Sequence, residues 1–461
     1  MSALTVRNVE VEGQAGLDVA LADGRIAAVG PRLPRAGPEI DGQGGALIPG
    51  LCDHHIHLFG LAAQAESVTL EGVATPQALA ARIAAAAAAR PDGAWLRVLG
   101  YHESQAGDLT RADLDRLAPR HRLRIQHQTG SLWMLNSLAL ESLGDGDAPP
   151  GVDREAGRVW RADAWLRHRI GAEPPALAPV GARLAACGVT AVTDASVTTD
   201  ADAARRLADA HRGGALPQRL TLMSGGPLAA PADGAFRVGP RKVLLDDHAL
   251  IDLDDFTARI AGARAEGRRV AVHCVTAAEL ALTLAAFAVA GVEPGDRVEH
   301  GSVIPPAAVA ELKALGLTVV TQPAFIRERG DRYLAQVAPE DLPDLYRCAS
   351  LMAAGLPVAA SSDAPYATAD PWVGIAAAVD RLSAGGRQVG AGEALSPAAA
   401  LGLYLDDPAG PGRHRRRVVP GAPADLCLLD APLHEALREP SQDRVRLTLV
   451  AGAVVHAAAR A

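Results

Sequence analysis

Two histidines separated by a single residue, His55 and His57, end an apolar run that is entered through Pro49-Gly50. Side chains alternate between the two faces of a β-strand, so a strand over residues 51–57 points both imidazoles to the same side. Two imidazoles on one strand face can bind the same divalent cation. Because a His-x-His pair also occurs by chance, this motif alone leaves metal binding and a structural role equally open.

Three further candidate ligands end later apolar runs: His273, His300 and Asp363. Taken singly, each fits a satisfied core or loop residue at least as well. Taken together with the first pair, they are four histidines and a carboxylate at strand ends, and the carboxyl ends of barrel strands share one mouth. Imidazole and carboxylate ligands suit zinc or a similar divalent cation. The set therefore indicates a metal centre.

Lys242 allows two interpretations. It begins the apolar run Val243-Leu244-Leu245 and precedes Asp246-Asp247, so an ordinary lysine paired with a neighbouring acid is the simpler one from spacing alone. The alternative is a buried amine with a lowered pKa. Such an amine can react with carbon dioxide to form a carbamate, which bridges two cations.

The elements that must position these residues alternate between strand-like and helical patterns, which is typical of βα units and a parallel sheet. Ten strands are expected, whereas an α/β barrel of the TIM type needs eight. The second and third are therefore assigned to an insertion at about residues 58–179 of a barrel that spans residues 49–404. The ten runs cover residues 51–57, 95–101, 123–128, 189–195, 220–224, 242–246, 270–275, 297–300, 318–322 and 358–363.

Both ends of the chain also predict short strands. Residues 1–48 carry β-branched and alternating runs separated by Gly and Pro, and residues 405–461 carry two more such stretches. A barrel inserted between two halves of a small β domain would bring the termini together. Within the insertion, Thr75 and Pro76 predict the start of a helix that Pro91-Asp92-Gly93 ends.

The composition supports a soluble enzyme with a small-molecule substrate rather than a nucleic-acid-binding protein. The net charge is −8, and the one dense basic run, residues 413–417, is short and is interpreted as a solvated loop. The five cysteines are odd in number and form no Cys-x-x-Cys pair, so buried thiols in a reducing cytoplasm are expected. Residues 1–21 lack a signal-peptide pattern, and no apolar run is long enough to cross a membrane.

At this point the sequence resembles the amidohydrolase superfamily, in particular its YtcJ-like branch (amidohydrolase 3). The similar segments run in family order over nearly the whole chain. They are Pro49-Gly50-Leu51-Cys52-Asp53-His54-His55-Ile56-His57, Leu109-Thr110-Arg111-Ala112-Asp113-Leu114-Asp115, Leu135-Asn136-Ser137-Leu138-Ala139-Leu140, Gly188-Val189-Thr190, Val272-His273, Val298-Glu299-His300-Gly301, Gln322-Pro323, Ser362-Asp363-Ala364-Pro365 and Pro420-Gly421-Ala422-Pro423-Ala424-Asp425-Leu426.

The resemblance implies a TIM-type (β/α)8 barrel joined to a small β-sandwich that is built from both chain ends. It also implies one or two divalent cations, with zinc expected. The implied ligands are His55, His57, His273 and His300, with Asp363 at the end of the last strand. In binuclear members a carboxylated lysine of the fourth strand bridges the metals, and Lys242 falls at the matching place.

The chain departs from the family pattern at three places. Ser131 follows Gly130 where a histidine is frequent, Asp247-His248 replaces the usual Asp-Gly turn, and Thr276-Ala277 replaces the usual Gly-Asp. These changes leave the implied metal ligands in place and leave the substrate open.

The expected activity is metal-dependent hydrolysis of an amide, cyclic amide or related C–N bond by metal-activated water. Asp363 is expected to act as general base and then as general acid. Loops after the strands are expected to bind the substrate, and the candidates are Tyr101, His127, Gln322 and Arg327. A metal-dependent decarboxylase or lyase on the same site and, less favoured, a non-catalytic scaffold protein are the alternatives. A homo-oligomer is possible.

Overall fold

The computed structural model describes residues 3–35, 37–70, 72–144, 146–171, 174–246 and 250–458. Within these ranges the chain forms two compact units. Unit 1 consists of Met1–Leu58 and Leu177–Ala461, and unit 2 consists of Phe59–Ala176. The replaced turn at Asp247-His248 lies outside the described residues.

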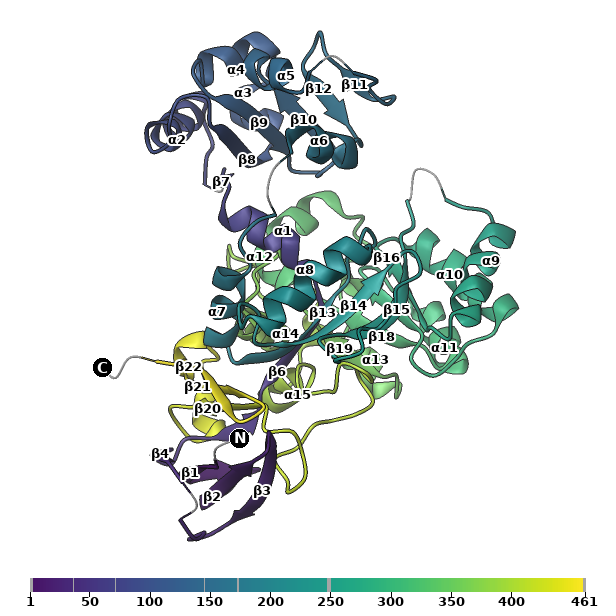
Figure 1. Cartoon of the computed structure of the whole chain (residues 1–461). Coiled ribbons are helices and arrows are strands. Elements are labelled where there is room, and N and C mark those ends of the chain that lie inside the picture. The colour runs from purple at the N-terminus through teal and green to yellow at the C-terminus, as the bar shows by residue number, and fades with distance from the viewer. Residues whose placement is uncertain are drawn as a thin grey trace. The chain divides into compact units, whose positions relative to one another are not determined.

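Unit 1 contains a sheet of eight parallel strands whose order is β19-β18-β17-β16-β15-β14-β13-β6 (Figure 1). The last strand, β19, contacts the first, β6, so the sheet closes into a barrel. These are the eight barrel strands expected from the sequence, which confirms the TIM-type α/β fold. They are β6 (Leu51–Ile56), β13 (Val189–Asp194), β14 (Arg219–Ser224), β15 (Arg237–Val243), β16 (Val270–Cys274), β17 (Arg297–His300), β18 (Thr318–Thr321) and β19 (Val358–Ala360).

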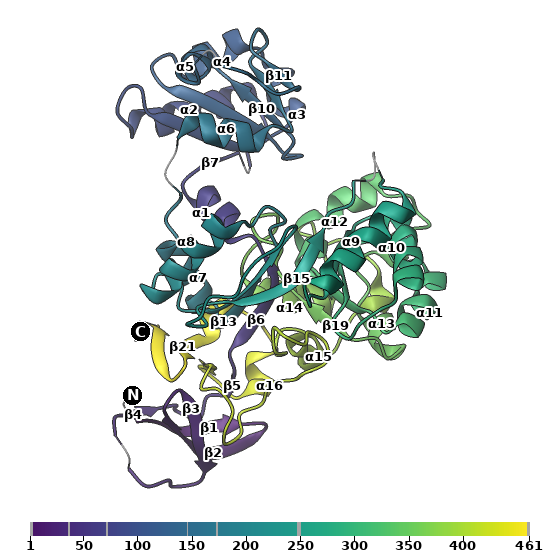
Figure 2. The ribbon, with the colours of Figure 1, turned by 45° about the vertical axis from the view of Figure 1, so that its right-hand side comes forward.

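Helices follow the strands and cover the outside of the barrel (Figure 2). The longer ones are α7 (Ala178–Ala186), α8 (Ala201–Arg212), α9 (Leu253–Ala265), α10 (Ala277–Ala290), α11 (Pro306–Leu315), α12 (Ala324–Gln336) and α14 (Pro371–Asp380). The shorter ones are α13 (Ala349–Ala353), α15 (Pro397–Gly402), η1 (Leu342–Asp344) and η2 (Ala391–Glu393). Helix α1 (Leu58–Ala65) belongs to unit 2 except for Leu58, and α16 (Leu433–Ala436) and η3 (Gln442–Arg444) lie near the C-terminal end of the chain.

One strand boundary expected from the sequence is wrong. The strand predicted to begin at Lys242 begins instead at Arg237, so Lys242 lies near the carboxyl end of β15. Gly239 and Pro240 lie inside the observed strand, although both residue types weaken strands. The structure accommodates them at a register shift between β14 and β15.

The two ends of the chain form the small β-sandwich. The N-terminal sheet has the order β3-β2-β1-β4, and the other sheet has the order β22-β21-β20-β5. Buried side chains from both sheets, including Val19 and Leu428, form one apolar core, and Figure 1 shows the purple and yellow strands side by side. The strands are β1 (Leu4–Val11), β2 (Gln14–Ala22), β3 (Arg25–Gly30), β4 (Glu39–Asp41), β5 (Leu47–Pro49), β20 (Leu426–Leu429), β21 (Val445–Val450) and β22 (Ala453–Ala457).

Unit 2 is a six-stranded sheet with helices. The strand order is β11-β12-β10-β9-β8-β7. Helix α2 starts after Thr75, whose side chain accepts a hydrogen bond from Ala78 N at 3.2 Å, so the predicted N-cap is confirmed. The elements are β7 (Val68–Thr69), α2 (Pro76–Ala88), β8 (Trp95–Tyr101), α3 (Glu103–Ala106), α4 (Arg111–Leu117), β9 (Arg122–His127), β10 (Leu132–Leu135), α5 (Ser137–Ser142), β11 (Val152–Asp153), β12 (Arg158–Trp160) and α6 (Asp163–Ile170).

The basic run is not merely a solvated loop, as the sequence had suggested. Arg415 pairs with Asp406, Arg417 pairs with Glu12, and Arg416 donates to Gly50 O. The run therefore ties the segment before the last sheet to its neighbours. All five cysteines are buried and free, as expected. In the ranges described, no helix combines the length and the apolar character needed to cross a bilayer.

Asp425 joins the sandwich to the barrel. It is buried, it pairs with Arg219 at the start of β14, and its Oδ1 accepts from Ala451 N at 2.7 Å. We expect Asp425→Ala to lower the free energy of unfolding by about 1–3 kcal/mol, because the partly buried Ala451 N–H loses its acceptor and Arg219 loses its charge partner. The matched control is Asp209→Ala, which removes an exposed pair with Arg212 and should cost less than about 1 kcal/mol. Equal losses in urea unfolding would contradict this account.

Candidate metal centre

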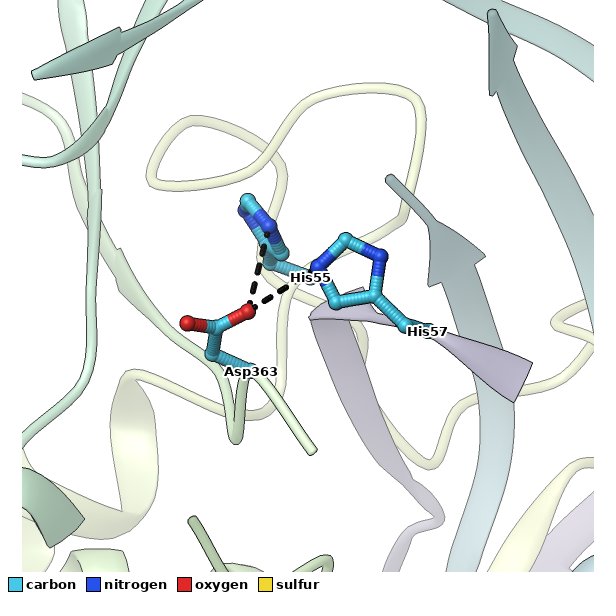
Figure 3. Close-up of side chains that lie close together, drawn as sticks. All are labelled: His55, His57 and Asp363. Atoms are coloured by element: carbon cyan, nitrogen blue, oxygen red, sulfur yellow. Dashed lines mark ion pairs between the residues drawn. The ribbon is translucent and has the colours of Figure 1, made fainter. Parts of the chain in front are cut away.

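Three side chains meet at the carboxyl end of the barrel: His55, His57 and Asp363 (Figure 3). The Oδ1 atom of Asp363 lies 3.1 Å from His57 Nε2 and 3.5 Å from His55 Nε2. One candidate ligand atom from each residue lies within 4.8 Å of the others. His55 and Asp363 are buried, while the His57 side chain is 22% exposed, so the cluster is reached from solvent on the His57 side.

The other two histidines lie beside this cluster. His300 ends β17, and its ring centroid is 4.8 Å from that of His55 and 4.5 Å from that of His273 in β16. The Nδ1 atom of His300 lies 3.8 Å from Asp363 Oδ2. The structure thus brings together the four histidines and the carboxylate named from the sequence, although their role as ligands stays a prediction.

Lys242 lies among the same groups. It is 4% exposed, and among the residues that the structure describes, its Nζ has no hydrogen-bond partner. Burial lowers the pKa of Lys242, while the negative charges of Glu299 and Asp363 oppose this shift. The chain contains only one other lysine, the exposed Lys313, among 45 lysines and arginines. A buried lysine in so arginine-rich a chain is therefore unusual for this protein.

The backbone is strained at two of the site residues. His300 has φ 68° and Asp363 has φ 55°, both in the left-handed region that non-glycine residues seldom adopt. In a regular strand the neighbours Glu299 and His300 would face opposite sides. The left-handed conformation lets both side chains contact His55. Such strain is characteristic of functional sites, where the surrounding structure holds it in place.

Several polar atoms of the cluster are buried without a partner. Within the described part of the chain this holds for His55 Nε2, Asp363 Oδ1 and Lys242 Nζ. His55 Nδ1 faces the Glu299 carboxylate at 2.5 Å and therefore carries the hydrogen, so its Nε2 lone pair faces an oxygen of Asp363. Leaving such groups buried and unpaired costs about 1–3 kcal/mol each. A divalent cation between them would remove this cost, so the donor set fits a metal ion.

Burial keeps these imidazoles neutral. It lowers the pKa of His273 from 6.5 to about 3, and the positive charge of Lys242 adds to the effect. Burial also lowers the pKa values of His55 and His300 well below the ordinary value. The neutral imidazole is the form that binds metals, so His55, His273 and His300 are in the ligand form at neutral pH.

The four predicted substrate-binding residues differ from one another in where they lie and in what they bind. Gln322 is buried; its Oε1 lies 3.0 Å from His300 Nδ1 and its Nε2 donates to Ser361, which favours a role in orienting His300. Arg327 pairs with Asp380 at 2.5 Å. Tyr101 and His127 belong to unit 2, where Tyr101 is buried and donates to Gly107 O. Substrate binding by these four residues stays a prediction.

The sequence reasoning missed three residues around the site. Ser196 Oγ lies 3.0 Å from His57 Nδ1, Glu299 holds His55, and the 55% exposed ring of Tyr366 packs 5.7 Å from the His57 ring. Two signals were present. Glu299 directly precedes the candidate ligand His300, and Tyr366 follows Asp363 by three residues.

Comparisons with known proteins agree with this geometry. The profile of the Amidohydrolase family matches residues 38–456. The N-substituted formamide deformylase of Arthrobacter pascens is 26% identical over 97% of this chain and 96% of its own length. The amidohydrolase YtcJ of Bacillus subtilis (strain 168) is 25% identical over 85% of each chain. The structure of a metal-dependent hydrolase from Pyrococcus horikoshii OT3 superposes with a TM-score of 0.76 at 20% identity and covers 93% of this chain and 97% of that one.

The lowered pKa of His273 gives a test in the metal-free protein. We expect its ring to stay neutral between pH 8 and pH 5, which ring-nitrogen NMR shifts would report. Below about pH 6.5 the His273 ring takes up a proton in the unfolded chain but not in the folded chain. The stability of the metal-free protein should therefore fall as the pH drops from 6.5 toward 3. A titration midpoint near 6.5 in the folded protein would refute the assignment.

Proposed function

The chain belongs to the amidohydrolase family, and from this membership we propose that it is a metal-dependent hydrolase that cleaves an amide, cyclic amide or related C–N bond other than a peptide bond. The observation that carries the proposal is the convergence of His55, His57 and Asp363, in which His55 Nε2 and Asp363 Oδ1 have no hydrogen-bond partner among the described residues. The formamide-cleaving activity of the Arthrobacter relative supports a C–N bond as the target.

The ligands of this proposal are His55, His57, His273, His300 and Asp363, and the expected metal is zinc, as one or two ions. Imidazole nitrogen and carboxylate oxygen are ordinary zinc ligands. When bound, the cation lowers the pKa of a water that it holds to about 7 and polarises the carbonyl group under attack.

Asp363 is the group that moves the proton. Its Oδ1 takes a proton from the attacking water as the new C–O bond forms, and it returns that proton to the departing nitrogen as the C–N bond breaks. Its backbone N–H donates to His55 O at 2.8 Å, which fixes the carboxylate beside the two imidazoles. Asp363 is 6% exposed, so bulk water does not compete for the proton.

The proposal is tested with the purified chain and a panel of N-substituted formamides and cyclic amides. We expect amine release that is lost on removal of divalent cations and restored by zinc. Carbon dioxide release without C–N hydrolysis would replace the proposal with a decarboxylase. A chain that binds no divalent cation and turns over no member of the panel would reject it in favour of a scaffold protein.

Asp363→Asn tests the proton carrier. We expect the variant to keep its metal content and to lose activity by at least about 100-fold, because general acid–base catalysis contributes roughly 10²–10⁴-fold. The control is Asp331→Asn, an exchange of a carboxylate on α12 that binds Ser383 and Gly385 away from the cluster. Metal analysis and amine release together decide the outcome, and retained turnover would remove Asp363 from this role.

We propose further that Lys242 is carboxylated. The neutral Nζ would attack carbon dioxide, a C–N bond would form, one proton would leave the nitrogen, and the resulting carbamate would supply oxygen ligands. The lowered pKa, the burial and the missing partner of Nζ support this step. A neutral lysine is the reactive form, which burial favours.

Lys242→Ala should lower the number of metal ions per chain, and a short carboxylate added in solution should partly restore it. Lys313→Ala, which changes the only other lysine of the chain, is the matched control and should bind metal as the unaltered protein does. With ¹³C-labelled bicarbonate, Lys313→Arg should give a single lysine carbamate signal that Lys242→Ala lacks. Full metal content in Lys242→Ala without added carboxylate, together with no carbamate signal, would return Lys242 to a structural role.

A further inference from the structure

We propose that Arg297 and Glu299 of β17 form a clamp that crosses the barrel interior and sets both the hydrogen position and the orientation of the His55 ring. This inference rests on the proposed function, because it assigns the two residues to the positioning of a metal ligand. The Arg297–Glu299 clamp lies behind the cluster, on the side of His55 that faces away from Asp363.

The first part of the clamp is the carboxylate of Glu299. Its Oε2 lies 2.5 Å from His55 Nδ1, and its Oε1 accepts from Arg297 Nε at 2.5 Å. The side chains of Glu299 and Arg297 are 0% and 1% exposed. In the closed barrel β6 neighbours β19, so β18 and β19 lie between β17 and β6. The bond from Glu299 to His55 therefore spans the inside of the barrel.

The second part of the clamp is the guanidinium of Arg297. Its Nη2 donates to the backbone carbonyl of His54 at 3.1 Å. One side chain of β17 thus holds the backbone of β6, while its partner Glu299 holds the ring of the next residue, His55. Arg297 also pairs with the fully buried carboxylate of Glu299, which would be costly to leave alone inside the barrel.

The chemical consequence follows from the hydrogen-bonding capacity of a carboxylate. An ionised carboxylate only accepts, so His55 Nδ1 must carry the ring hydrogen and Nε2 must carry the lone pair. That lone pair points into the cluster, where His55 Nε2 has no partner among the described residues. Outer hydrogen bonds of this kind to metal-binding histidines commonly contribute about 10–100-fold in metal affinity.

The test compares two double variants, R297M/E299Q and R297M/E299L. Both remove the buried ion pair, so neither leaves an unpaired charge. They differ in one respect: the glutamine of the first variant keeps an oxygen that can accept from His55 Nδ1, whereas the leucine of the second does not. We expect the zinc affinity of R297M/E299L, measured by competition with a chromophoric chelator, to be about 10–100-fold weaker than that of R297M/E299Q. The visible spectrum of bound cobalt should change in R297M/E299L and stay close to that of the unaltered protein in R297M/E299Q.

The control is R347M/E393Q, which removes a partly buried Arg–Glu pair whose carboxylate binds the backbone of Cys348 and Ser350 rather than a histidine. It should lower the unfolding midpoint of the metal-free protein without changing zinc affinity or the cobalt spectrum.

Equal zinc affinities in the two R297M variants would overturn the clamp and leave the proposed hydrolase intact. An unaltered protein that binds no divalent cation would overturn the proposed function and the clamp together. If R297M/E299L does not fold, R297M/E299A replaces it in the same comparison, because alanine likewise offers no acceptor to His55 Nδ1. Weaker zinc binding than in R297M/E299Q then supports the clamp, and equal binding overturns it.

Discussion

The bond pattern that closes the barrel is the constraint on which the site depends. The Asp53 carboxylate of β6 accepts from Ser362 N at 3.0 Å and from Ser362 Oγ at 2.5 Å, and Asp363 N donates to His55 O at 2.8 Å. Burial raises the pKa of Asp53 to about 6, although its hydrogen bonds with Ser362 lower it. The carboxylate therefore stays ionised at neutral pH and holds the first and last strands together. Because His55 and Asp363 flank this seam, closure of the barrel also sets their separation.

The polar groups that support the site from outside have hydrogen-bond partners, whereas two atoms that face its centre have none among the described residues. Glu299, Arg297 and Gln322 each have partners within the protein, and they hold His55 and His300 from outside the cluster. In contrast, His55 Nε2 and Asp363 Oδ1 face one another without a hydrogen bond from the described residues. Folded proteins rarely leave buried polar atoms unpaired, and the exceptions call for an explanation. A cation held between these atoms is the explanation that fits their chemistry.

The sequence predicted the fold class well because its signals were local and repeated. Alternation in strands placed His55 and His57 on one face, and the rule that carboxyl ends of barrel strands meet brought His273, His300 and Asp363 to the same mouth. The strand that carries Lys242 begins five residues earlier than expected, and a register shift accommodates the Gly239 and Pro240 that it contains. The partner of a side chain across the barrel, such as Glu299 for His55, depends on tertiary packing that spacing along one strand does not encode.

Substrate residues were harder to predict for the same reason. Gln322 was chosen for its place after a strand, but its amide is engaged at both ends inside the protein. Arg327 was also chosen for its place after a strand, and in the structure it forms an ion pair with Asp380. Tyr366 was not chosen, although it is an exposed aromatic beside His57. The position of a residue after a strand thus says where it lies in the barrel, whereas the partners of its side chain decide what it can contact.

Unit 2 divides unit 1 into two segments of the sequence, and this affects the order in which the chain can fold during synthesis. Strand β5, which begins at Leu47, pairs with β20, which begins at Leu426, so the sandwich cannot form until the polypeptide has left the ribosome beyond that point. Unit 2 is one continuous stretch that ends at Ala176, and all its strand partners are present much earlier. Domains generally fold as units while the chain emerges. All of unit 2 has thus been synthesised before β13 and β19, the two strands that neighbour β6 in the barrel.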